Sequence, residues 1–244
     1  MNVHVSRSAF AILGTLVLAT ATNASAQTRR KSDLPAEHSA SPDLASGHSV
    51  LLGVESVMGF EAVYVTTKQE AAGRSQEVKT STTSLGLLGE RRADFAADAF
   101  LADHITLGGS LSYASGSGTQ ESSGTKTDLD SESVWRAGPR VGFYAPVAPA
   151  LAFWLRGGVE YVRDSTESTL TGGSKSTTTV SLTQLAISPA LLWFVAPHLA
   201  INFAATAKTI VASSYDVSPA PALTPSTSYS GQVYNVTVGL TGAL

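Results

Sequence analysis

The alternating stretch from residue 134 to residue 161, VWRAGPRVGFYAPVAPALAFWLRGGVEY, constrains the fold of this chain more than any other. In each arm, large apolar side chains occupy every second position, and Arg, Glu and Gly occupy most positions between them. A period of two indicates extended strands, because successive side chains of a strand point to opposite faces. We therefore predict a β-hairpin around the Pro-rich centre. A soluble sandwich would bury its apolar face, whereas a membrane barrel would turn that face to lipid.

The N-terminus has the pattern of an export signal. Arg7 precedes the apolar run Ala9–Ala21, which is too short to cross a bilayer as a helix, so a membrane anchor is disfavoured. The triplet Ala24-Ser25-Ala26 offers the small side chains of a cleavage site. We predict a secretory signal peptide over residues 1–26 that is removed before Gln27. The chain contains no cysteine, so disulfides do not stabilise it after export.

Charge and hydropathy narrow the class further. The chain has 16 basic and 19 acidic residues, and losing Arg7 with the signal leaves 15 and 19, a net charge of −4. This mildly acidic balance argues against a nucleic-acid partner. After residue 26 no apolar run is long enough for a membrane helix. Yet only 14% of residues are charged and the mean hydropathy is +0.11. An exported chain this apolar, with no spanning helix, is typical of an outer-membrane barrel.

The alternation predicts about eight strands, each longer than the strands of soluble proteins. We expect them near residues 48–67, 82–92, 105–113, 134–143, 151–161, 179–194, 199–208 and 229–244. The predicted strand over residues 179–194 loses its alternation near Gln184, which predicts a β-bulge there. Polar segments 68–81, 115–133, 164–177 and 211–228 are expected to be loops, and 95–103 a turn. Residues 27–46 are expected to be a flexible periplasmic leader, and residues 47–244 a single domain.

The connections alternate between short and long. Short turns recur in FLADHITLGG, YAPVAPALAF and FVAPHLAINF, which suggests a repeated hairpin unit. Short turns on one rim and long polar segments on the other are the asymmetry of a membrane barrel. Aromatic residues are expected to form a girdle at each interface. The short-turn girdle would hold Phe95, Phe100, Phe143, Tyr144, Phe153, Trp154, Trp193 and Phe194, and the other Phe60, Tyr64, Tyr113, Trp135, Tyr161, Tyr229 and Tyr234.

Through this architecture and the segment FLADHITLGGSLSY, residues 47–244 resemble the small eight-stranded outer-membrane barrels of Gram-negative bacteria, the OmpA/OmpX-like proteins. The resemblance implies an all-β, antiparallel, up-and-down transmembrane β-barrel in the cell outer membrane. It also implies contact with outer-membrane lipid and lipopolysaccharide, insertion by the barrel-assembly machinery, and a monomer. The chain departs from the family pattern at its end, where Leu244 stands in place of the usual terminal Phe.

We predict no catalytic, cofactor-binding or metal-binding residues. Some outer-membrane barrels of this size modify lipid A or cleave proteins, with their catalytic groups toward the outer leaflet. Here His38, His48, His104 and His198 all fall toward the short-turn side, which leaves no general base where that chemistry would need one. The segment 171–176 lacks the Gly-Lys pair and the strand-to-helix context of a phosphate loop. Carboxylates at Asp128, Asp130 and Glu132 could bind a divalent cation, but a solvated face is the favoured interpretation.

Charged side chains at inward positions predict a network in the lumen. Its members are Glu55, Glu90, Arg92, Arg136, Arg140, Arg156 and Glu160, with Lys208 farther along its strand. Buried charges must be paired, because isolated burial is too costly. A hairpin symmetric about Val147–Ala148 sets Arg136 opposite Glu160 and Arg140 opposite Arg156. We therefore expect Glu55 or Glu90 to bridge the last two arginines.

Such a network would plug the barrel. Eight strands enclose an interior just wide enough for side chains, which disfavours a general diffusion pore. The sequence therefore favours an outer-membrane barrel with a structural or surface-interaction role and long polar extracellular loops. A narrow porin-like channel for small solutes or ions is the alternative. A soluble β-barrel binder such as a lipocalin is a third possibility, and it would be extracted without detergent.

Overall fold

The computed structural model describes residues 49–71, 74–87, 93–122, 125–169, 174–219 and 226–244. Every regular element among these residues is a β-strand, so the prediction of an all-β fold is confirmed. The strands are β1 (Val50–Ala71), β2 (Arg74–Leu87), β3 (Ala93–Ala102), β4 (Ile105–Ser122), β5 (Thr125–Ala148), β6 (Leu151–Thr169), β7 (Lys175–Ala196), β8 (Leu199–Ser218) and β9 (Ser226–Ala243). Within the described residues no helix has the length and apolar character needed to cross a membrane.

Several expectations concern positions outside the described residues. These are the signal peptide, the leader with His38, His48 at the start of the first predicted strand, the central residues of the four expected loops, and two members of the predicted lumen network. The positions are residues 1–48, Gly73, Gly124, Gly173, Ala220, Glu90 and Arg92.

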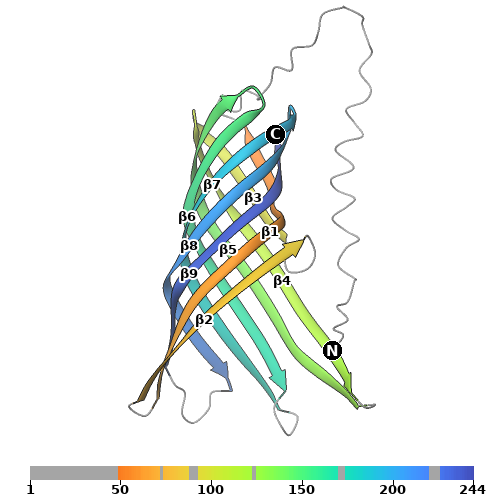
Figure 1. Ribbon diagram of the computed structural model, residues 1–244, viewed down its shortest axis with the longest axis vertical. Coiled ribbons are helices and arrows are strands. Elements are labelled where there is room, and N and C mark those ends of the chain that lie inside the picture. The colour runs from red at the N-terminus through yellow and green to blue at the C-terminus, as the bar shows by residue number, and fades with distance from the viewer. Residues whose placement is uncertain (1–48, 72–73, 88–92, 123–124, 170–173, 220–225) are drawn as a thin grey trace, which may run out of the picture. The chain divides into compact units, whose positions relative to one another are not determined.

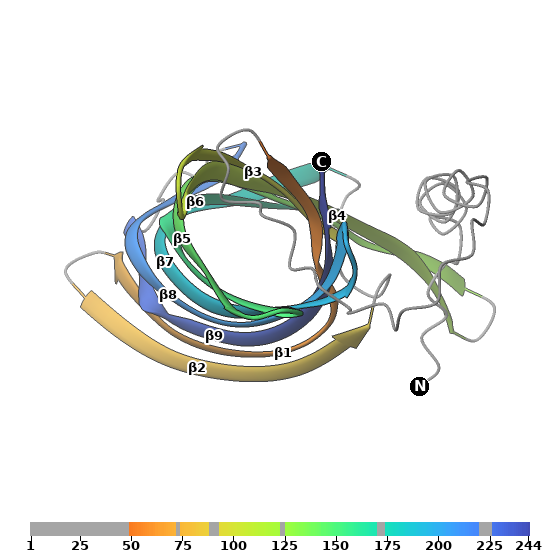
Figure 2. The ribbon, with the colours of Figure 1, turned by 90° about the horizontal axis from the view of Figure 1, so that it is seen from above.

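The strands form one antiparallel sheet that closes on itself. Its order is β2-β1-β3-β4-β5-β6-β7-β8-β9, and β1 also pairs with β9. The closed ring therefore contains eight strands, from β1 through β3 to β9, as the sequence predicts. Figure 1 shows the strands tilted against the long axis, and Figure 2 shows them curling around a lumen.

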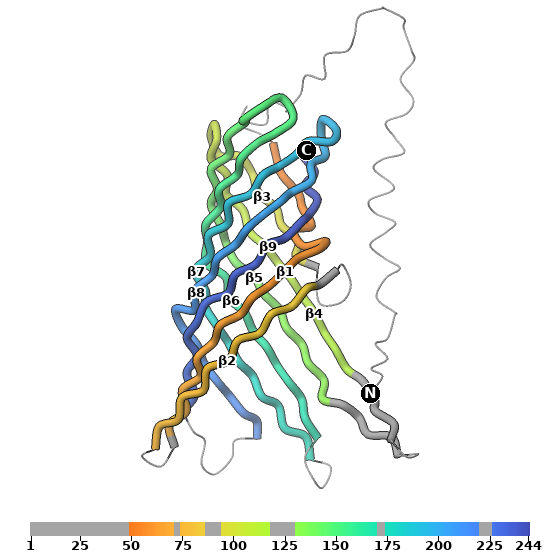
Figure 3. The backbone as a smooth tube through the Cα atoms, in the orientation of Figure 1, coloured from red at the N-terminus to blue at the C-terminus, as the bar shows by residue number. Residues whose placement is uncertain are grey.

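The predicted second strand is divided into β2 and β3. β3 closes the ring by pairing with β1 over Val50–Val54 and with β4. β2 continues along β1 from Met58 to Ala71 and, within the described part of the chain, pairs with no other strand. Among the described residues no strand joins β2 to β4 beyond the Ala93 end of β3, and the β1–β2 and β4–β5 hairpins splay apart there, at the lower end of the view in Figure 3.

The outer face of the ring carries a continuous apolar band. On β6 the band runs over nine residues from Phe153 to Tyr161, which matches the ~9–11 residues of a transmembrane β-strand. Its side chains are exposed to the surroundings of the barrel, as membrane contact requires. Examples are Phe60, Leu107, Val141, Leu155, Ile187, Leu191, Phe203, Val236 and Leu240. An apolar exterior around a charged lumen is the membrane-barrel alternative of the sequence analysis, and it contradicts the soluble one.

Aromatic rings border the band at both ends, but the predicted short-turn girdle is only half right. Phe143, Phe153 and Trp193 are exposed near the short turns, whereas Tyr144, Trp154 and Phe194 point into the lumen. Phe100 is also buried inside. The reason is parity: in each adjacent aromatic pair, the two side chains must point to opposite faces of the strand.

The girdle at the other end is almost as predicted. Trp135 packs on Tyr161 with ring centroids 5.3 Å apart, and Tyr64 meets Tyr234 edge to face at 6.2 Å. Phe60 and Tyr113 are exposed with them. Tyr229 is not part of this girdle, since it lies on the inward parity of β9 and is half-buried.

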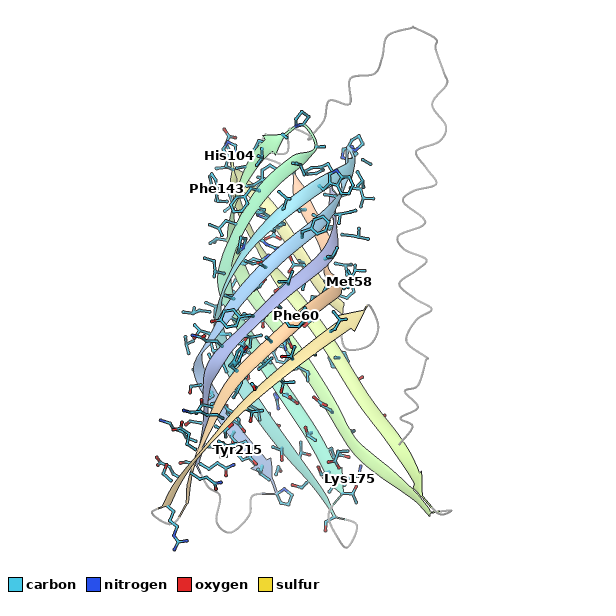
Figure 4. All side chains as sticks on the ribbon, viewed as in Figure 1. Met58, Phe60, His104, Phe143, Lys175 and Tyr215 are labelled. Carbon is cyan, nitrogen blue, oxygen red and sulfur yellow. The ribbon has the colours of Figure 1, made fainter. Side chains whose placement is uncertain are left out.

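The expected loops are wrong over most of their length. Residues 68–71, 74–81, 115–122 and 125–133 continue the strands as paired hairpins, and the β6–β7 hairpin extends likewise to residues 169 and 175. β8 and β9 extend to residues 218 and 226, but there β8 pairs with β7 and β9 pairs with β1. These segments are rich in Ser and charged residues and include some β-branched Thr, which suits a strand. They have no apolar alternation because both faces can be hydrated. In Figure 4, His104 and Phe143 mark the short-turn end, and Lys175 and Tyr215 the opposite end, called here the hairpin end.

The expected turn over residues 95–103 is also wrong. Ala93–Ala102 is strand β3, and only Asp103 and His104 make the turn, with His104 at a φ of 70°. Five alanines in β3 weaken the contrast between its two faces, which hid its alternation. The bulge predicted near Gln184 is confirmed by a register shift at Thr183 and Gln184, and Val211 of β8 is the extra residue.

The β5–β6 hairpin keeps its predicted faces but not its predicted register. Arg136 lies opposite Val162, Arg140 opposite Gly158, and Gly142 opposite Arg156. The pairing is therefore displaced by two residues, because the turn is at Pro149 and Ala150 and carries an irregularity beside Ala148. A slip of two leaves every side chain on its predicted face, whereas a slip of one would have reversed all of them.

Candidate functional site

The short-turn half of the lumen is filled by side chains, called here the apolar floor. Its large members are Leu51, Phe100, Tyr144, Trp154, Leu192 and Phe194, all almost fully buried. Phe100 meets Tyr144 edge to face with ring centroids 5.4 Å apart. Alanines from β6, β7 and β8 fill the space between the large groups, as in the interior of a small closed barrel.

Next to this floor, on the side toward the hairpin end, lies a balanced cluster of two arginines and two acids, the four-charge cluster. Arg140 donates from Nη1 to Glu55 Oε1 at 2.7 Å. On its other side it donates from Nε to both carboxylate oxygens of Asp98, at 2.9 and 3.1 Å, and from Nη2 to Asp98 Oδ2. Arg156 donates from Nη1 to the same oxygen of Glu55. One carboxylate thus holds two guanidinium groups, and Asp98 balances the second positive charge.

Trp154 joins the apolar floor to the four-charge cluster. The guanidinium carbon of Arg156 lies 4.5 Å from the centre of its ring, and that of Arg140 lies 5.5 Å away. Both distances are within the range of a cation–π contact. The indole N–H donates to Thr106 Oγ1 at 3.2 Å, so its polar atom is satisfied although the residue is buried.

Glycines provide the space for these large groups. A Cβ at Gly108 would lie 2.5 Å from Asp98 Oδ1 and 2.1 Å from the carbonyl oxygen of Ala97. A Cβ at Gly142 would lie 2.4 Å from Thr106 Oγ1 and 2.6 Å from Trp154 Nε1. The alternation of Arg with Gly in the sequence therefore has a steric cause in the lumen.

A second cluster, the basic triad, lies farther toward the hairpin end. Lys208 donates from Nζ to both carboxylate oxygens of Glu160 at 2.8 Å, and Arg136 Nη1 lies 3.9 Å from Glu160 Oε1. The sequence paired Glu160 with Arg136 alone. In the structure the closer partner of Glu160 is Lys208, which lies on β8, two strands away from β6.

On the hairpin-end side of the four-charge cluster, the lumen holds a cavity of about 150 Å³, which we call the cup. Arg140 and Arg156 lie at its bottom, and the basic triad lines one side. Glu61 and Asp94 also line the cup, with hydroxyls of Ser84, Ser110, Ser112, Ser188, Thr206 and Thr237 around it. The lining also reaches Phe60 and Leu111, which belong to the outer face, on the side where no described strand joins β2 to β4.

Five of the seven residues of the predicted network are described, and all five lie in these two clusters. Glu55, Arg140 and Arg156 meet in the four-charge cluster, and Arg136 and Glu160 belong to the basic triad. Two important residues were missed. Asp98 was assigned to a turn and Trp154 to a lipid-facing girdle. Both stand at inward-facing positions in the alternation of their strands, and this alternation could have identified them.

Other candidate sites of the sequence gain no support. Within the described part of the chain, no group of three or more His, Asp or Glu side chains is placed to hold a metal ion. Asp130 and Glu132 are exposed, and the side chain of Asp128 lies outside the described set. His104 has a structural contact: its ring donates from Nδ1 to the carbonyl oxygen of Tyr144 at 2.8 Å, at the short-turn rim.

Comparisons with known proteins agree with this fold. No protein-family model matches the chain, and no curated protein matches it in sequence. Among solved structures it is similar to the outer membrane protein OprG from Pseudomonas aeruginosa, with a TM-score of 0.51 and 10% identity over 81% of this chain and 96% of that one.

Two further solved structures are similar at a lower level. Neisserial surface protein A gives a TM-score of 0.40 and 10% identity over 77% of this chain and 97% of that one. The attachment invasion locus protein Ail of Yersinia pestis, in complex with the heparin analogue sucrose octasulfate, gives 0.40 and 11% over 81% and 99%. The closed ring of eight strands, its apolar exterior and its similarity to OprG show that the chain has the fold of a small outer-membrane β-barrel.

Proposed function

We propose that this protein is a non-conducting barrel of the outer membrane that holds extended polar β-hairpins at the cell surface. The observation that carries the proposal is the filled lumen: the apolar floor and the four-charge cluster together occupy its cross-section. Side chains such as Trp154 and Leu192 have at most 1% of their surface exposed, which leaves no space beside them for a hydrated ion.

The charges support a stable plug rather than a pore lining. Glu55 and Asp98 balance Arg140 and Arg156, so the four-charge cluster has no net charge to attract permeating ions. Breaking one pair would leave an uncompensated charge in a confined interior, which is strongly unfavourable. A narrow channel would require these contacts to open and the apolar floor beneath them to move.

The hairpin end supports a role in surface contacts. The strands there extend well beyond the apolar band, with polar residues on both faces, as in the pairing of Ser115 with Ser133 and Ser122 with Thr125. We infer that these hairpins lie outside the cell and present their exposed backbone and hydroxyl groups to a partner, with the short turns in the periplasm. Lipid and lipopolysaccharide would surround the band, and one copy of the chain completes the ring.

Conductance of the refolded protein in planar bilayers tests the plug. We expect no steady unitary current from the native protein. Trp154→Ala, which opens the lumen beside Leu192, should raise the frequency of current events. Trp193→Ala is the matched control, because Trp193 lies on the outer face of the same barrel. A steady current through the native protein that Arg140→Ala leaves unchanged would contradict the proposal and favour the narrow channel.

A truncation tests the role of the hairpins. Replacing residues 116–132 by a short turn removes the distal part of the β4–β5 hairpin but none of the lumen clusters. We expect the shortened barrel to refold in detergent, as its circular dichroism would show, while any surface binding through this hairpin is lost. Failure of the shortened chain to fold would show that the hairpin belongs to the barrel rather than to a surface module.

A further inference from the structure

A row of polar side chains from four consecutive strands runs along one wall of the cup. Arg156 of β6 is paired in register with Ser188 of β7, and Thr206 of β8 is paired with Asn235 of β9. Thr206 Oγ1 donates to Ser188 Oγ at 2.8 Å, and Arg156 Nη2 donates to the same oxygen at 3.3 Å. All four residues line the cup, and we call them the polar row.

The polar row has hydrogen-bonding capacity that the described residues leave unused. Arg156 has only 3% of its surface exposed, yet its Nε–H has no hydrogen-bond partner among them. At the other end of the row, the buried Oδ1 acceptor of Asn235 has none either. Between them, Ser188 Oγ accepts two hydrogen bonds, so its own O–H remains available to donate. Buried polar groups are normally satisfied, so these donors and this acceptor indicate an occupant that can both accept and donate.

Beside the polar row, the wall of the cup is apolar. Gly158 of β6 is paired with Ala186 of β7, and Gly138 of β5 lies nearby along the lining. These residues present only backbone and a methyl group to the cavity. A buried water needs two to four polar partners, which such a surface does not supply, whereas a carbon skeleton packs on it favourably. The cup therefore combines a hydrogen-bonding wall with an apolar one.

The size of the cup limits its occupant. A cavity of about 150 Å³ is the size that holds one benzene molecule in an engineered protein core, that is, about six non-hydrogen atoms. The four-charge cluster and the apolar floor close the cup toward the short turns, so an occupant enters from the hairpin-end side.

We propose that the cup binds a small neutral polyol of the size of glycerol, with its hydroxyls on the polar row and its carbon skeleton on Gly158 and Ala186. A hydroxyl accepts and donates, so one molecule can accept from Arg156 Nε and from the Ser188 hydroxyl and donate to Asn235 Oδ1. A carboxylate could not donate to Asn235, and an ammonium could not accept from Arg156.

This inference goes beyond the proposed surface role and does not depend on whether the barrel conducts. The occupant reaches the cup without passing the four-charge cluster. Failure of the inference would therefore appear as absent binding, whereas failure of the plug would appear as current.

The test compares glycerol with an isostere and with a larger polyol. Pentan-3-ol has the shape of glycerol with both terminal hydroxyls replaced by methyl groups, and mannitol is twice the size of glycerol. Each is titrated into the refolded full-length protein, and binding is followed by the amide signals of Ser188 and Asn235 at equal free ligand concentrations. We expect glycerol to bind with a Kd of about 1–10 mM, about tenfold more tightly than pentan-3-ol, and mannitol not to bind.

Variants assign the contacts. Asn235→Leu should weaken glycerol binding about tenfold and leave pentan-3-ol binding unchanged or tighter. Ala186→Leu fills the cup from the apolar side and should abolish the binding of both, which gives a second test if the first variant does not fold. Asn202→Leu is the matched control, because Asn202 is a buried lumen amide without hydrogen-bond partners that does not line the cup. It should leave glycerol binding unchanged.

Four results would overturn the proposal. The first is no saturable shift with glycerol, which would mean that water alone occupies the cup. The second is pentan-3-ol binding as tightly as glycerol, which would mean an apolar site that does not use the polar row. The third is equally tight binding of mannitol, which the volume of the cup does not permit. The fourth is glycerol binding that neither Asn235→Leu nor Ala186→Leu weakens, which would place the polyol elsewhere on the protein.

Discussion

Arg140 Nη1 lies 2.7 Å from Glu55 Oε1, although the two residues are 85 positions apart in the chain. Glu55 lies where β1 leaves β3 and has not yet begun to pair with β2, between the register positions Val54 and Met58. The irregularity of β1 at this point lets its carboxylate reach both Arg140 and Arg156. The four-charge cluster therefore depends on the division of the predicted second strand into β2 and β3, because Glu55 lies at the point of β1 between these two partners.

Glu55→Gln should strongly destabilise the barrel, because it leaves two buried arginines with only Asp98 as counter-ion. We expect a loss of about 3–5 kcal/mol in the free energy of unfolding, measured by urea titration in lipid vesicles. Glu167→Gln is the control: Glu167 pairs with Lys175 at 2.6 Å, but both side chains are exposed, so about 0–1 kcal/mol is expected. Equal effects of the two substitutions would show that the lumen pair has no special weight.

Gly108→Ala should destabilise the barrel through overpacking. Its Cβ would meet the carbonyl oxygen of Ala97 at 2.1 Å and Asp98 at 2.5 Å, and backbone cannot move away cheaply. A loss of about 1–3 kcal/mol is expected in the same urea titration. Gly116→Ala is the matched control, because no atom lies within 4 Å of its Cβ position. A variant at Gly108 as stable as the one at Gly116 would contradict the packing around Asp98.

Leu155→Arg tests which face of the wall meets lipid. Leu155 is exposed within the apolar band, between Phe153 and Tyr161. An arginine there should cost about 2–4 kcal/mol of folding free energy in lipid. Val78→Arg, at an exposed position of the β1–β2 hairpin beyond the band, should have almost no effect. Unchanged folding of Leu155→Arg in vesicles would place the membrane elsewhere.

Single cysteines test the orientation in the membrane, since the chain has none of its own. Gln76→Cys lies at the hairpin end, and Val147→Cys lies at an exposed position beside a short turn. On intact cells a membrane-impermeant maleimide should label only Gln76→Cys, and Val147→Cys should react after the outer membrane is permeabilised. The reverse pattern would overturn the inferred topology.

Asp164 provides a pH-dependent test beyond the apolar band. Burial raises the pKa of its carboxyl above the ordinary value of 3.8, and Glu132 raises it further, while Arg136 opposes the shift. A raised pKa means that the folded state holds the proton more tightly than the unfolded state. Stability should therefore fall as the pH rises from about the unfolded pKa through the folded one. Asp164→Asn should remove this slope and raise the melting temperature at neutral pH, as circular dichroism in detergent would show.

The sequence by itself determined which way the charged side chains of β5 and β6 point. Arg136, Arg140, Arg156 and Glu160 were assigned inward by alternation alone, and all four are inward. This succeeded because the side-chain period of two is a local property of the extended chain, and neither the turn nor the neighbouring strand can alter it.

The tertiary structure decided which of those inward groups touch. Register shifted by two residues at the Pro149–Ala150 turn, so Arg136 faces Val162 rather than Glu160, and Lys208 became the closer partner of Glu160. The lumen also contains Asp98 and Trp154, which the sequence did not predict. They were missed because an alanine-rich strand and a pair of adjacent aromatic residues do not reveal by hydropathy which side chain points inward. Contacts across a barrel depend on turn geometry, bulges and the closure of the ring, which are long-range properties that no single strand carries.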